Sequence, residues 1–161
     1  AGIISKATTV ADLPDDALAR TFEVNVYGTV YRAREAILRM ATSKGGSGGI
    51  IVNVSSVAAC LVSPGEDIHY AASKAAVETF IIALAKEFGG EGIRVNALQA
   101  GTTDTDIQKS FGNSDRPAMV AAMSPLGRVA SADDIAAGTL WLASPESGYV
   151  TGAVLPVSGG L

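Results

Sequence analysis

The polar and apolar positions of the chain follow two different periodicities. Residues 50–54 and 93–98 are short apolar runs with few polar interruptions, a pattern typical of strands buried on both faces of a parallel sheet. Between residues 13 and 40, apolar side chains recur instead at three- and four-residue steps, which predicts a long helix. A second helical stretch begins after the 50–54 run and continues to about residue 88.

The remaining segments extend this alternation. Residues 1–4 resemble the end of a strand, and residues 149–157 form a final strand. A capping sequence at Ser131 opens a helix that reaches Trp141. Alternating strands and helices indicate an α/β fold, in which a parallel sheet carries helices on both faces. The polar segment 102–125 is long for a connection, and we expect it to form a lid that shapes the substrate site.

Composition and charge narrow the possible functions. The chain has 161 residues, of which 48% are hydrophobic, so it suits one domain with a buried core. The net charge is −4 and no basic run occurs, which argues against a nucleic-acid partner. Cys60 is the single cysteine; it excludes an internal disulfide and fits the reducing cytoplasm. We find neither a signal peptide nor an apolar stretch of about 20 residues, so no membrane partner is expected.

The most informative chemistry is a tyrosine and a lysine four residues apart. Tyr70 and Lys74 would share one face of a helix, where the ammonium would pull the tyrosine pKa down from about 10 towards neutrality. Such a tyrosine can exchange a proton near physiological pH. Ser55 and Ser56 end the preceding strand, and a hydroxyl there could hold a substrate oxygen. Sites of parallel sheets lie at the carboxyl ends of their strands, where these groups fall.

The chain resembles the short-chain dehydrogenase/reductase family across its whole length. The similarity is carried by several motifs, which occur in the family's order and at fitting separations. These are AGI at the start, FEVNVYG with Asn25, IIVNVSS, YAASK, RVNALQAG, WLAS and YVTGAVLPVSGG. Each motif is modest alone, and the specificity of the resemblance comes from the complete series.

The resemblance implies an NAD(P)-dependent oxidoreductase, which transfers a hydride between the nicotinamide and an alcohol/carbonyl substrate. Tyr70 would be the acid/base, and Ser56 would hydrogen-bond the substrate oxygen. Lys74 would lower the tyrosine pKa and hold the nicotinamide ribose hydroxyls. Asn25 would anchor a water that links Lys74 to solvent. Ser56 is preferred to Ser55 because it lies fourteen residues before Tyr70, a separation common in the family.

The cofactor implied is NAD or NADP. The residues expected to contact it are Gly2, Tyr70, Lys74, Gly101, Thr103 and Thr105. The two threonines would lie against the nicotinamide carboxamide, although ordinary lid positions are an equal alternative for them. Ala100 stands where the family usually has proline, which would loosen the turn before Gly101.

The chain lacks the Gly-x-x-x-Gly-x-Gly turn of the family, which cradles the cofactor pyrophosphate at a helix N-terminus. We therefore expect an incomplete Rossmann-like doubly wound sheet without its N-terminal strands. Residues 1–161 would be the catalytic portion of a single domain, belonging to a longer polypeptide or relying on a partner. A truncated, non-catalytic module for oligomerisation or interaction is the alternative, and an epimerase or dehydratase is a third. The resemblance also implies a homodimer or homotetramer, paired through the helices of Asn25 and Tyr70.

Several other side chains could have a functional role, but their positions in the sequence argue against one. His69 is adjacent to Tyr70, but neighbouring helix residues face different ways, so we expect an exposed or substrate-rim histidine. Glu66, Asp67 and Asp104 lack the spacing of metal ligands and are expected to be hydrated. No metal site is predicted.

Overall fold

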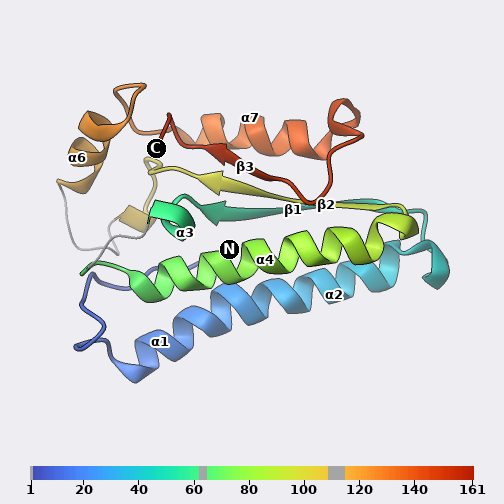
Figure 1. Cartoon of the computed structure of the whole chain (residues 1–161), viewed down its shortest axis with the longest axis horizontal. Helices are drawn as coiled ribbons and strands as arrows, with labels where there is room; N and C mark the ends of the chain where they lie inside the picture. The colour runs from blue at the N-terminus through green and yellow to red at the C-terminus, as the bar shows by residue number, and fades with distance from the viewer. Residues whose placement is uncertain (1, 62–64, 109–114) are drawn as a thin grey trace.

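The computed structural model describes residues 2–61, 65–108 and 115–161. Its centre is a parallel sheet of three strands, β1 (Gly49–Ser56), β2 (Ile93–Ala100) and β3 (Val154–Val157), in the order β1-β2-β3. The strands all point the same way, so their carboxyl ends share one edge of the sheet (Figure 1). The final strand is shorter than the predicted 149–157, because the chain turns at Gly152, whose φ is +73°.

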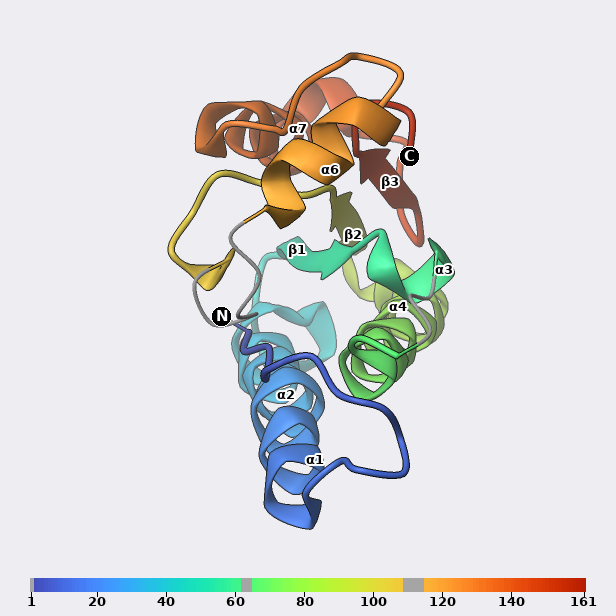
Figure 2. The same cartoon turned by 90° about the vertical axis from the view of Figure 1, so that its left-hand side faces the viewer.

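Helices cover both faces of this sheet. α2 (Gly28–Met40) and α4 (Ile68–Phe88) lie on one face, and α7 (Ala132–Ala143) lies on the other (Figures 1 and 2). This arrangement confirms the predicted α/β doubly wound class. Within the described part of the chain, β1 pairs only with β2, so its outer edge carries no strand and the sheet is incomplete.

The core fills the space between α2, α4 and the sheet. Its side chains are small or branched aliphatics, which let the two helices approach the strands closely. They are Ala33, Ile37, Ala41, Val77, Ile81, Leu84, Ala85, Ile93, Val95 and Ala97. Burial of this cluster packs the first half of β2 against the middle and end of α4 and the second half of α2.

The predicted helix over residues 13–40 is present but not regular. α1 (Asp15–Phe22) passes into a π-helical turn, Glu23–Tyr27, which continues into α2. π turns are rare, and they are frequent at functional sites. The short elements are α3 (Ala58–Leu61), α6 (Arg116–Met123) and the 3₁₀ turns Thr42–Lys44, Gly89–Glu91 and Pro145–Ser147.

Three sequence-based expectations differ from this structure. Residues 2–4 form no strand, because the Ile3 backbone bonds to a side chain; Ala1 lies outside the described residues. The segment 102–125 is not a continuous loop, since α6 occupies its second half. The segment Ile68–Glu91 is long and apolar enough to cross a bilayer, contrary to the expectation, but half of its most apolar stretch is buried in the fold. Its contacts with the sheet mark it as a core helix.

Candidate active site

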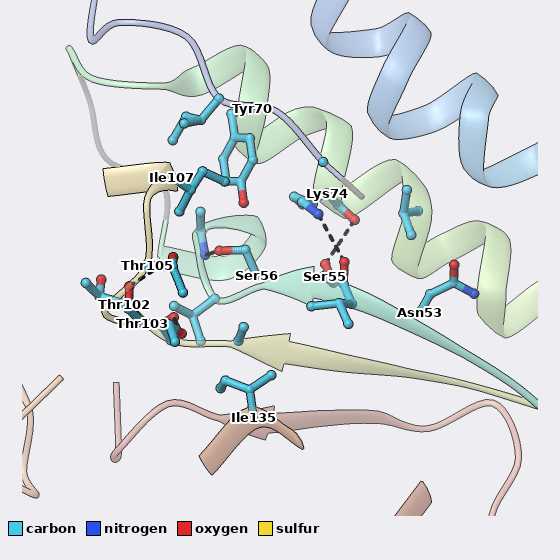
Figure 3. Close-up of a pocket in the computed structure, with 18 of the residues that line it drawn as sticks. Asn53, Ser55, Ser56, Tyr70, Lys74, Thr102, Thr103, Thr105, Ile107 and Ile135 are labelled. Atoms are coloured by element: carbon cyan, nitrogen blue, oxygen red, sulfur yellow. Dashed lines mark hydrogen bonds between the residues drawn. The ribbon is translucent and has the colours of Figure 1, made fainter. Parts of the chain in front are cut away.

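A cleft of about 1100 Å³ opens at the carboxyl ends of β1 and β2. Ser56 and Gly101 follow from the two strand ends, and Tyr70 and Lys74 enter from α4 (Figure 3). The register pairs Ser56 with Ala100, so the two strand ends reach the cleft at the same level. Three of the four predicted catalytic residues therefore meet in one cavity.

Tyr70 lies at the wall of this cleft with its hydroxyl turned towards Ser56 (Figure 3). Burial raises the pKa of Tyr70, and hydrogen bonding to the Ser56 hydroxyl opposes that shift. The Ser56 oxygen also accepts the backbone N–H of Ala58 at 3.2 Å, which fixes its rotamer at the start of α3. The phenol and the serine hydroxyl are thus both held facing the same space.

Lys74 lies one helical turn beyond Tyr70 and is 7% exposed. Its Nζ donates to the carbonyl oxygen of Val54 at 3.0 Å and lies 5.6 Å from the centre of the Tyr70 ring. Burial lowers the pKa of Lys74 to about 8, and the negative charge of Glu78 opposes this shift. One proton of the ammonium is used by Val54, which leaves two for a ligand.

The expected lowering of the Tyr70 pKa is wrong for the chain in this state. The shift is upward because loss of hydration penalises the phenolate more than the neighbouring groups favour it. Lys74 directs its ammonium to the end of β1 and not to the phenol oxygen. Sequence spacing placed the two side chains on one face, but it carried no information about burial.

Asn25 lies inside the π turn and is 2% exposed. Its Oδ1 accepts the Ile3 N–H at 2.8 Å, and its Nδ2 donates to the Ile3 carbonyl at 3.0 Å and to Ser73 Oγ at 3.1 Å. A Cβ on Gly2 would lie 3.2 Å from Lys74 Nζ and 3.3 Å from Asn25 Oδ1. Gly2 therefore passes close between the amide and the ammonium, and the water-anchoring role of Asn25 stays a prediction.

The remaining predicted cofactor residues line the same cleft. A Cβ on Gly101 would lie only 2.8 Å from Ser158 Cα, so the chain leaves β2 in close contact with the end of β3. Thr103 donates its hydroxyl to the Gly101 carbonyl at 2.9 Å, and its backbone forms a bridge with Ala130. Thr105 is exposed beside it. Both threonines line the cleft (Figure 3), and the Thr105 hydroxyl donates to the Thr103 carbonyl at 3.4 Å.

The predictions for His69 and Asp67 are wrong. His69 is 4% exposed, and its Nε2 forms a 2.7 Å hydrogen bond with Ser5 Oγ, which turns the ring away from the cleft. Asp67, expected to be hydrated, is 1% exposed, and neither carboxylate oxygen has a hydrogen-bond partner. Burial raises the pKa of Asp67, against the lowering effect of Arg116. Within the described residues no cluster suited to a metal ion occurs.

Sequence reasoning missed a polar cluster behind the cleft. Ser55, treated as a strand-end residue, donates to Glu78 Oε1 at 2.6 Å, and Gln99 Nε2 donates to both carboxylate oxygens at 3.0 and 3.1 Å. The one available signal was Glu78 lying four residues after Lys74 on the predicted helix. Only the sheet register, which pairs Ser55 with Gln99, shows that these side chains converge.

The chain resembles a known protein family and several of its members over most of its length. The family model described as enoyl-(acyl carrier protein) reductase matches residues 1–161. The chain is 42% identical over 160 residues to the uncharacterized oxidoreductase YgfF of Escherichia coli (strain K12), covering 99% of this chain and 65% of the relative. It is 38% identical to L-rhamnose 1-dehydrogenase (NAD(P)(+)) of Sphingomonas sp. (strain SKA58), covering 93% of this chain and 58% of that protein.

A solved structure agrees with the sequence relatives. The 3-ketoacyl-(acyl-carrier-protein) reductase from Brucella melitensis, complexed with NADH, superposes with a TM-score of 0.88 at 30% identity. The match covers 99% of this chain and 64% of that one, so the chain spans about two-thirds of the length of the proteins it resembles. Because the family model covers every residue and the fold is shared at high similarity, the chain belongs to the short-chain dehydrogenase/reductase family of oxidoreductases.

Proposed function

We propose that this chain carries the catalytic portion of an NAD(P)-dependent oxidoreductase, which transfers a hydride between the nicotinamide and a small alcohol/carbonyl substrate. The observation that carries the proposal is the meeting of Ser56, Tyr70 and Lys74 in one cleft at the carboxyl ends of β1 and β2. A phenol, a hydroxyl donor and an ammonium in that arrangement suit a reaction in which negative charge develops on oxygen.

The residues around Lys74 fit a nicotinamide nucleotide. Two protons of the ammonium remain for ribose hydroxyls after the bond to Val54. Gly2 brings the backbone close to this ammonium, and a Cβ there would crowd the Lys74 Nζ at 3.2 Å. Thr103 and Thr105 supply hydroxyls on the opposite wall, which suit a carboxamide.

In the reducing direction, Tyr70 donates its phenolic proton to the substrate oxygen as that oxygen gains an electron pair. Ser56 donates a hydrogen bond to the same oxygen and holds it in place. Lys74 stabilises the phenolate that remains, through its positive charge. The nicotinamide, when bound, supplies or accepts the hydride. In the oxidising direction the proton moves from the alcohol to Tyr70, so the same groups serve both directions.

The rest of the cleft supports a small organic substrate. Ile107, Met119 and Met123 line it from segment 102–125, and apolar side chains there would exclude water from the reacting atoms. This supports segment 102–125 as the substrate lid. We further propose that the protein is cytoplasmic and assembles as a homodimer or homotetramer.

The proposal is tested in the full natural polypeptide with Tyr70→Phe and Lys74→Met. Loss of the phenolic proton should reduce turnover by about 10²–10⁴-fold, because general acid–base catalysis contributes that much, while cofactor affinity changes little. Lys74→Met should weaken both turnover and cofactor binding. Turnover is followed by nicotinamide absorbance, and binding by quenching of NADH or NADPH fluorescence.

Matched controls are available in the same chain. Tyr149 is fully exposed and Lys86 is exposed on the same helix as Lys74, so Tyr149→Phe and Lys86→Met should leave both readouts unchanged. Normal activity in Tyr70→Phe would remove the mechanism. If the unaltered protein quenches neither nucleotide, the alternative of a non-catalytic oligomerisation or interaction module takes its place.

A further inference from the structure

A buried carboxylate in the wall of the cleft has no hydrogen-bond partner. Asp67 is 1% exposed and lines the cleft directly before α4. Neither of its carboxylate oxygens accepts a hydrogen bond from the part of the chain that the structure describes. An unpaired buried carboxylate destabilises a fold, so its presence at this position needs an explanation other than stability.

The place of Asp67 at the start of α4 makes its missing partners more informative. Asp67 is the N-cap of this helix, where an aspartate usually accepts a backbone N–H of the first turn. Its side chain makes no such bond. The positive end of the helix dipole favours a negative charge here, which explains why the carboxylate is tolerated. The dipole does not explain why both oxygens are left without a donor.

Asp67 is also within reach of a molecule bound at the proposed chemistry. Tyr70 follows three residues later, and both residues line the cleft from the first turn of α4. Cβ atoms at this helical spacing are about 5–6 Å apart. No hydrogen bond within the described structure holds the Asp67 side chain, so rotation about its Cα–Cβ bond can turn an oxygen towards the cleft. Because the tyrosine ring separates its Cβ from its hydroxyl, the part of a substrate that reaches Asp67 lies several atoms from the reacting oxygen.

The charges beside Asp67 distinguish between the possible ligands. Glu66 and Arg116 line the same wall, and Arg116 Nε lies 3.9 Å from Glu66 Oε2. An anionic group would meet two carboxylates there. A cationic group would give up its hydration and would meet the Arg116 guanidinium. A neutral hydroxyl avoids both penalties, and it donates a strong hydrogen bond to a carboxylate.

We propose that Asp67 is a substrate-binding residue: its carboxylate accepts hydrogen bonds from the hydroxyl groups of a polyhydroxylated substrate, a polyol or a sugar. This inference rests on the proposed function, because it takes the reacting oxygen to be bound at Tyr70. It narrows the small alcohol/carbonyl class to substrates that carry hydroxyl groups several atoms beyond the reacting carbon. Such a substrate supplies the donors that the fold does not give to this carboxylate.

The test compares two kinds of substrate in the full natural polypeptide with NAD or NADP. Ribitol and sorbitol are the polyols, and 2-pentanol and 2-hexanol are monohydric alcohols with the same numbers of carbon atoms. Asp67→Leu removes the charge and both acceptor oxygens, whereas Asp67→Asn removes the charge and keeps one acceptor. Asp104→Asn is the matched control, because Asp104 is an exposed aspartate in the neighbouring segment 102–125. Oxidation is followed by nicotinamide absorbance.

The unaltered protein should prefer the polyols by at least about ten-fold in kcat/KM. Asp67→Leu should lower kcat/KM for the polyols by about 10–100-fold, because a hydrogen bond to a charged group contributes that much. Asp67→Asn should lower it less, and Asp104→Asn should leave it unchanged. Nucleotide affinity and kcat/KM for the monohydric alcohols should not change in any variant. Equal losses for both kinds of substrate, or a preference of the unaltered protein for the monohydric alcohols or for 5-amino-1-pentanol, overturn the proposal.

A binding measurement separates this inference from the proposed function. If the unaltered protein oxidises none of these alcohols, that result counts against the proposed function, and polyol binding decides the role of Asp67. Saturation-transfer difference NMR detects ribitol and sorbitol on the protein without turnover. The signal should be present with the unaltered protein and with Asp104→Asn, and it should be lost in Asp67→Leu. Equal signals in all three proteins, or no signal in any of them, contradict the proposal.

Discussion

Burial decides the behaviour of the ionisable residues at this site. The spacing of Tyr70 and Lys74 correctly predicted that they share a helix face, and the structure places both beside one cleft. The direction of the Tyr70 pKa shift could not be predicted, because the sequence does not say how much water a side chain loses. The same limit applies to His69 and Asp67, which are both buried; His69 bonds to Ser5 in the segment before α1.

Asp67 gives a prediction about stability and pH. Because its pKa is raised in the folded chain, its ionised form costs stability at every pH above the folded pKa, and this cost disappears below its ordinary value of 3.8. Asp67→Asn should therefore raise Tm at pH 7, by about 2–4 °C if the relief is about 1 kcal/mol. The gain should vanish near pH 3.5, as measured by thermal unfolding across pH.

Asp134 provides a control of opposite sign. Its pKa is lowered by Arg128 and by the Ser131 backbone and hydroxyl, so its stabilising effect is present above its ordinary pKa and is lost as the pH falls through the folded value. Asp134→Asn should lower Tm at pH 7, where Asp67→Asn raises it. If Asp67→Asn proves destabilising at pH 7, its carboxylate must have a favourable partner, and the argument from burial fails.

At the scale of elements, the sequence patterns correctly predicted the helices and strands that interactions within each segment determine. β1, β2, α4 and α7 lie close to their expected positions, because apolar periodicity and caps are encoded within each segment. The π turn around Asn25 was not predicted, since the interactions that accompany it reach to Ile3 and Ser73, far away in sequence. The Glu78 cluster was missed for the same reason, because it depends on how two strands are paired.

The cap of α7 gives an element-scale prediction. Ser131 Oγ accepts the Asp134 N–H at 3.2 Å, and the Asp134 carboxylate accepts the Ser131 N–H at 2.7 Å, so two unpaired donors are satisfied at once. Ser131→Ala should cost about 1 kcal/mol in the free energy of unfolding, measured by urea denaturation. Ser131→Thr keeps the hydroxyl acceptor and should lie close to the unaltered protein; an equal loss in both would point to packing instead of capping.

For the whole molecule, the outer surface of the helical layer suggests self-association. Tyr27, Tyr31 and Leu38 form an exposed apolar stripe along the π turn and α2, and each is at least half exposed. Stripes of this kind mark interaction surfaces. In the full natural polypeptide, Tyr31→Glu combined with Leu38→Glu should lower the mass measured by light scattering from a dimer or tetramer towards a monomer.

The matched control introduces a glutamate outside the stripe. Val10 is 66% exposed in the loop before α1, away from the stripe, so Val10→Glu should leave the mass unchanged. A monomeric unaltered protein would contradict the predicted oligomer. If the mass is unchanged in the variant that carries both stripe substitutions, the interface lies on another surface of the molecule.

Side chains along β1 face alternately to opposite sides of the sheet, and this limits the insertions and deletions that the strand can accept. Ser55 points to α4 and Ser56 to the cleft, and successive strand residues always face opposite ways. Inserting or deleting one residue between Gly49 and Ser56 would exchange the two serines, leaving Glu78 without its Ser55 donor and Tyr70 without its Ser56 neighbour. Beyond Val57, the connection to α4 can lengthen or shorten with far less damage. Tolerance to changes in length should therefore begin abruptly where the strand ends.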